Sequence, residues 1–89
     1  MKTKEGFVLR PLLNEYIITG EGLAQVNFNK MISLNATAAW LWQEVEGKEF
    51  SVEDLKNLLL QRYEVTEEVA GADAARLAET WIQAGIVDA

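Results

Sequence analysis

The sequence predicts an α+β fold: a winged-helix-like domain in which a three-stranded antiparallel sheet is followed by three helices. β-branched and aromatic residues, separated by turn residues, fill the first third of the chain. In the remainder, apolar residues recur at three- and four-residue spacing, which is typical of amphipathic helices. Because a sheet this small cannot bury both faces alone, we expect one face to pack on the helices.

Three strand segments are expected before the helices. The first, residues 7–10, is expected to stop at Pro11, since proline cannot donate a hydrogen bond within a sheet. The second covers residues 15–19. The third covers residues 25–34, where apolar side chains mostly occupy alternate positions, and its paired core is expected at residues 30–34.

Three helices are expected to follow, each with a recognisable start. Asn35 is a suitable N-cap for a helix over residues 36–46, Ser51 opens the second helix and Thr66 opens the third. Glycine is expected to end the first and third helices, at Gly47 and Gly85. The apolar stripes of the three helices are Ala38, Leu41, Trp42 and Val45, then Val52, Leu55, Leu59 and Tyr63, then Ala70, Ala74, Leu77 and Trp81.

The tryptophans raise the question of core or binding surface. Trp42 shares the apolar stripe of its helix and is expected in the core. Trp40 lies about 200° away around the same helix, so it either covers another part of the chain or is an exposed anchor for a partner. For Trp81, core and ligand wall are equally consistent with the sequence.

Composition limits the partners and the location. The 89 residues are expected to form a single domain over residues 1–89. The net charge of −6 argues against non-specific binding to nucleic acid, which requires neutralised phosphates. A membrane span needs about 20 apolar residues, and the sequence has no such run. The lack of cysteine is compatible with a reducing compartment, and a cytoplasmic location is expected.

Residue types also bear on chemistry. The chain has no histidine and no cysteine, so it lacks the usual metal ligands and nucleophile–base pairs. It has no glycine-rich phosphate loop of the dinucleotide or nucleotide type. Its paired carboxylates stand at expected helix starts, where capping explains them. The sequence therefore predicts a binding module that is not an enzyme and carries neither metal nor cofactor.

Five segments together resemble the PqqD family, coenzyme PQQ synthesis protein D. They are GFVLRPL, EYII, SLNATAAWLWQEVEG, SVEDLKNLLLQRYEV and ADAARLAETWIQAGIV, and they cover residues 6–87. The positions that fit the family pattern are Leu34, Asn35, Ala38, Leu41, Trp42, Gly47, Leu55, Tyr63, Asp73, Leu77, Trp81, Gly85 and Ile86. The longer segment at residues 21–29 departs from the proteins of the PQQ pathway and suggests a relative that serves another peptide.

The resemblance implies a peptide-recognition function. Proteins of this family hold the leader of a ribosomally made precursor peptide and present it to a modifying enzyme, commonly a radical SAM protein. The leader adds a strand to the sheet, so that main-chain bonds supply affinity and side-chain pockets supply selectivity. The residues implied here are the strand edge Lys30, Met31, Ile32 and Ser33, and the helix wall Asp73, Arg76, Leu77, Thr80 and Trp81.

Two alternatives stay open at this stage. A winged-helix DNA-binding protein has a similar architecture, but neither of the last two helices carries a basic stripe. A structural assembly subunit without a peptide ligand is the other alternative. An open strand edge is also compatible with a homodimer.

Overall fold

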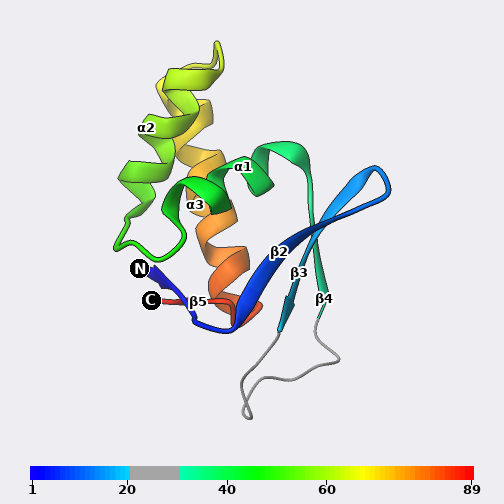
Figure 1. Ribbon diagram of the computed structural model, residues 1–89. Helices are drawn as coiled ribbons and strands as arrows, with labels where there is room; N and C mark the ends of the chain where they lie inside the picture. Colours follow the sequence, from blue (N-terminus) through cyan, green and yellow to red (C-terminus); the bar gives the residue numbers. More distant parts are fainter. Residues whose placement is uncertain (21–30) are drawn as a thin grey trace.

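A three-stranded antiparallel sheet lies beside three helices (Figure 1). The structure is a computed structural model, and it describes residues 1–20 and 31–89. The elements in chain order are β1 (Lys2–Thr3), β2 (Phe7–Leu12), β3 (Glu15–Gly20), β4 (Met31–Leu34), α1 (Ala36–Val45), α2 (Val52–Arg62), α3 (Glu67–Gln83) and β5 (Val87–Asp88). The strand order β2-β3-β4 and the helices that follow confirm the predicted α+β fold. The earlier part of the predicted third strand, residues 25–30, lies outside the described residues.

The first strand of the sheet does not stop at Pro11, as the sequence had suggested, but continues to Leu12. Pro11 lies opposite Tyr16 in the register with β3, and a two-residue turn after Leu12 leads into Glu15. In an antiparallel pair, hydrogen-bonded and non-hydrogen-bonded positions alternate, and the position next to a two-residue turn is hydrogen-bonded. Pro11 therefore occupies a non-hydrogen-bonded position on an outer strand, where its missing N–H costs the sheet nothing.

Side-chain caps hold the beginnings of all three helices. The Asn35 Oδ1 accepts a hydrogen bond of 2.8 Å from the Ala38 N–H, at the start of α1. At the start of α2, Ser51 and Asp54 form a reciprocal capping box. Thr66 caps α3 in the same way as Asn35 caps α1. These hydrogen bonds confirm the three expected caps. The sequence could predict them because each cap joins residues that are close along the chain.

The core lies between the helices and one face of the sheet. Its largest fully buried side chains are Trp42, Trp81, Ile18, Leu41, Leu55 and Ile86. Ile17 is also buried, but it lies outside this cluster. Because successive side chains of a strand point to opposite faces, Ile18 enters the core while Ile17 faces the other side of the sheet.

A second, two-stranded sheet joins the two ends of the described chain, and the sequence did not predict it. β1 pairs with β5 in antiparallel register, beneath the helices in Figure 1. Gly85, with a φ of 79°, ends the last helix and lets the chain turn back. Ile86 and Val87 are then buried in the core.

Among the described residues, no helix is long and apolar enough to cross a membrane.

Candidate functional site

The outer side of β4 is an open strand edge within the described part of the sheet. β4 pairs with β3 through Leu34 opposite Tyr16 and Ile32 opposite Ile18. Pro11 and Tyr16 form a non-hydrogen-bonded position between β2 and β3. Tyr16 and Ile18 therefore direct their backbone groups toward β4.

The same alternation fixes which groups of β4 face outward. Leu34 and Ile32 form the hydrogen-bonded positions with β3, so the N–H and C=O groups of Met31 and Ser33 point to the open edge. Met31 and Ser33 both belong to the strand edge, residues 30–33, that the family resemblance implies. Lys30, the first residue of that segment, lies outside the described residues.

A groove of about 370 Å³ adjoins the end of this edge. Its lining residues are Asn35, Thr37, Ala38, Leu41, Leu59, Asp73, Arg76, Leu77 and Thr80. Asn35 directly follows β4, so the strand edge leads straight into the groove. In Figure 1, β4 rises to the start of α1, and α3 passes behind α1.

One face of α3 forms a wall of the groove. Arg76 and Leu77 lie three and four residues after Asp73, and Thr80 lies three residues after Leu77, which places all four on one side of the helix. These are four of the five wall residues that the family resemblance implies. The structure therefore brings them together, in a groove that begins where the strand edge ends.

Trp81, the fifth of these residues, lies in the core and is not among the residues that line the groove. Its side chain is 0% exposed. Its ring packs edge-to-face on Trp42 at 5.3 Å and on Phe50 at 6.4 Å between centroids. Of the two roles that the sequence left open, the structure gives Trp81 the core position, one turn beyond Leu77.

The polar groups of the groove are exposed and partly paired with one another. The Arg76 guanidinium lies 3.9 Å from the Asp73 carboxylate, and both side chains are more than half exposed. The Thr80 hydroxyl donates a 2.8 Å hydrogen bond to the Arg76 carbonyl. Because an exposed ion pair is weak, Arg76 and Asp73 remain accessible to the polar groups of a ligand.

Residues from α1 and α2 complete the groove, and the sequence analysis did not assign them to it. Thr37 and Ala38 come from the first turns of α1, and Leu59 comes from α2. The sequence indicated the α1 residues only indirectly. Because α1 begins just after the edge strand β4, its first turn must lie beside that edge.

Trp40 packs against α2, which answers the question that the sequence raised about this side chain. The Trp40 and Tyr63 rings meet edge-to-face, with centroids 6.4 Å apart. The Arg62 guanidinium carbon lies 4.5 Å from the centroid of the Trp40 ring. Trp40 is half-buried and covers the end of α2, whereas Trp42 is fully buried, as predicted.

Among residues 1–20 and 31–89, no group of three or more acidic side chains is placed to hold a metal ion. The groove's own groups are hydrogen-bond donors and acceptors around an apolar floor of Leu41 and Leu59. Such a surface is suited to binding a peptide segment.

Comparisons with known proteins agree with this architecture. The family model for coenzyme PQQ synthesis protein D (PqqD) matches residues 14–87. No curated protein matches the sequence. A solved structure of TbiB1 in complex with the TbiA(beta) leader peptide is similar, with a TM-score of 0.74 and 17% sequence identity. The similarity covers 99% of this chain and 95% of the TbiB1 chain, and it shows a shared fold.

Proposed function

The chain belongs to the PqqD family, and on that premise we propose that it binds the leader of a ribosomally made precursor peptide. The leader pairs as an added strand with the open edge of β4, and its side chains enter the groove that α1, α2 and α3 line. The protein holds the peptide without catalysing a reaction and presents it to a modifying enzyme, a radical SAM protein.

The observation that carries the proposal is the continuity between strand edge and groove. Met31 and Ser33 direct their backbone groups outward, and Asn35 then opens the groove. An extended peptide uses both features at once, because its backbone pairs with the edge while alternate side chains point toward the helices. The TbiB1 structure, which has a similar fold and is a complex with a leader peptide, supports a leader peptide as the ligand.

Within the groove, we assign the four α3 residues separate roles. Leu77 supplies apolar contact, and Arg76 and Asp73 offer a cation and an anion to the peptide. Thr80 uses its hydroxyl proton within the helix, so its oxygen is left as an acceptor. Trp81 supports this wall from the core, where its ring fixes the packing of α3 on α1.

The test uses a peptide selected by display from a random library, titrated into isotope-labelled protein. We expect the backbone amide signals of residues 31–34 and 73–80 to shift. Shifts confined to the exposed face of α2 would contradict the proposal. Signals of residues 31–33 that change with protein concentration in the absence of peptide would instead indicate pairing between two copies of the chain.

A pair of proline variants separates binding from folding. Met31→Pro removes an N–H that faces the open edge, so the sheet keeps its bonds while peptide affinity falls by about threefold to tenfold, as for one lost hydrogen bond. Ile32→Pro removes an N–H that pairs with β3, so it lowers the free energy of unfolding. Equal loss of stability in the two variants, measured by circular dichroism in urea, would show that the edge is assigned to the wrong residues.

The role of a modifying enzyme needs its own test. We expect the purified protein to leave a precursor peptide unmodified and to increase its modification when the radical SAM enzyme is added. Mass spectrometry of the peptide with and without the protein measures this effect. Equal modification in both samples would contradict the presenting role while leaving peptide binding unaffected.

A further inference from the structure

Two smaller hollows adjoin the groove and share lining residues with it. One, of about 360 Å³, lies beside the turn of the β2–β3 hairpin and shares Asn35 with the groove. The other, of about 150 Å³, lies at the end of α2 and the start of α3. It shares Thr37, Leu59 and Asp73 with the groove, so the three hollows form one track.

The hollow at the α2–α3 end has an apolar floor and a polar mouth. Leu59 and Ala70 are buried at its base, and the 39% exposed side chain of Val65 lies at its rim. Thr37 and Asp73 stand where it joins the groove. We call this hollow, lined by Thr37, Leu59, Tyr63, Val65, Ala70 and Asp73, the α2–α3 subsite.

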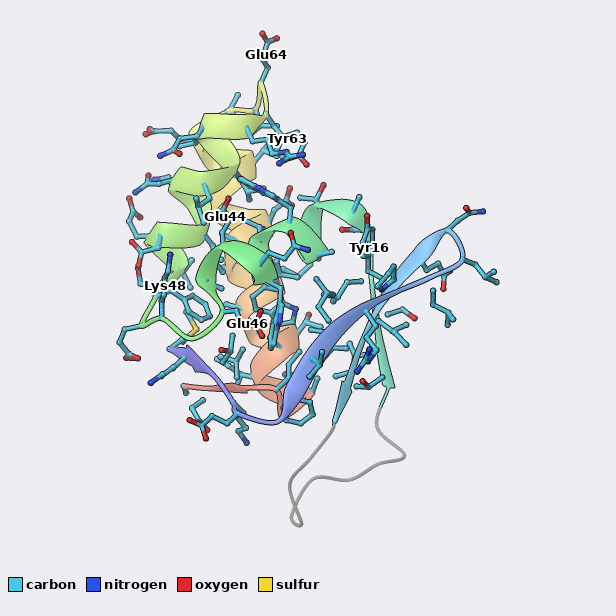
Figure 2. The ribbon with its side chains drawn as sticks, viewed as in Figure 1. Tyr16, Glu44, Glu46, Lys48, Tyr63 and Glu64 are labelled. Atoms are coloured by element: carbon cyan, nitrogen blue, oxygen red, sulfur yellow. The ribbon has the colours of Figure 1, made fainter. Side chains whose placement is uncertain are left out.

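Tyr63 forms a wall of the subsite, and contacts with Thr37, Trp40 and Arg62 hold its ring in place. Its hydroxyl lies 3.1 Å from the Thr37 hydroxyl, within hydrogen-bond distance. Its ring meets Trp40 edge-to-face, and Arg62 lies over both rings. In Figure 2, Tyr63 lies at the end of α2 and Tyr16 lies below the start of α1. Since the wall is fixed before any ligand arrives, little ordering is required on binding.

Volume and lining indicate what fits. An apolar cavity of about 150 Å³ accommodates a molecule the size of benzene. Ala70 contributes only a methyl group to the lining, so it leaves space in the hollow beside Leu59 and Val65. The subsite therefore suits one aromatic ring or one branched aliphatic side chain.

We propose that the α2–α3 subsite binds one aromatic or branched aliphatic side chain of the peptide, at a position outside the segment that pairs with β4. This rests on the proposed function, because the occupant is the same peptide continuing past Leu34 along the track. The groove shares Thr37, Leu59 and Asp73 with the subsite, so the peptide passes Thr37 and Asp73 to reach the subsite from the strand edge. Selectivity for a peptide then depends on two separate contacts, one at the strand edge and one in the α2–α3 subsite.

The test compares two exposed valines with the same display-selected peptide. Val65 lies at the rim of the subsite, whereas Val69 is 47% exposed and lies outside the residues that line it. We expect Val65→Gln to weaken binding by about fourfold, as for the loss of roughly one buried methylene group. Val69→Gln is expected to leave affinity unchanged. Alanine replacement of the peptide's anchoring apolar residue should weaken binding to the parent protein and have little further effect in Val65→Gln.

Amide shifts in the parent protein distinguish this inference from the proposed function. Shifts at residues 31–34 together with residues 63–70 support both. Shifts at residues 31–34 alone overturn the subsite and leave the proposed function standing. Shifts at residues 63–70 alone contradict strand addition and, with it, a peptide that reaches the subsite from the edge of β4. Equal effects of the two valine variants, or shifts in neither region, overturn the subsite.

Discussion

The two halves of the α1–α3 interface are filled in different ways. Toward the C-terminal ends of both helices, the rings of Trp42, Trp81 and Phe50 pack together and are almost completely buried. Toward the N-terminal end of α1, the small or polar side chains Thr37 and Ala38 line the groove together with residues of the middle and later turns of α3. α1 thus borders a closed core at its C-terminal end and an accessible groove at its N-terminal end. Side-chain volume decides between them, since large rings fill the space that a groove needs.

The largest expected effect belongs to the closed half. Trp42→Ala should lower the free energy of unfolding by about 3–5 kcal/mol, because it removes a fully buried ring and its contact with Trp81. Trp40→Ala should cost roughly 1–2 kcal/mol, since that side chain is half-buried. Urea unfolding followed by circular dichroism measures both. Equal losses would show that the two sides of α1 are not distinct.

A smaller effect is expected where α1 begins, beside the groove. Asn35→Ala should cost about 1 kcal/mol, because the Ala38 N–H loses its capping acceptor. Asn35→Asp keeps an acceptor at the same place and should retain most of the stability. If both variants lower the urea midpoint equally, the cap is not what stabilises this end of the helix.

The bond between α1 and the end of α2 should contribute a similar or smaller amount. Thr37→Val and Tyr63→Phe each remove one hydroxyl from a partly buried hydrogen bond, so each should cost about 0.5–1.5 kcal/mol. A double-mutant cycle isolates their interaction, and the double variant should cost less than the sum of the single ones. Strict additivity would mean that the two hydroxyls do not interact in solution.

The smallest effect on stability is expected inside the groove. Asp73→Asn breaks an exposed ion pair with Arg76, so the free energy of unfolding should change by less than about 0.5 kcal/mol. Thermal unfolding at low and high salt measures this. A loss above 1 kcal/mol that salt abolishes would show that the ion pair stabilises the fold, and the pair would then be less available to a peptide.

The sequence by itself determined the features that depend on near neighbours along the chain. Asn35, Ser51 and Thr66 each cap a helix through a backbone group three residues on, so their residue types were sufficient to place the helix starts. The burial of Trp42 likewise followed from its place on the apolar stripe of one helix.

The tertiary structure decided what depends on distant partners. Trp40 could be identified as a side chain that covers the end of α2 only because the fold places Tyr63 and Arg62 beside it. The outward direction of the Met31 and Ser33 backbone groups followed from the two-residue turn between β2 and β3 and from the register of β3 with β4. Trp81 and Leu77 are both on the apolar side of α3, yet Trp81 is buried and Leu77 lines the groove. Helical spacing gives the side of a helix that faces inward, but the size of the opposing residues determines whether that side is closed or open to a ligand.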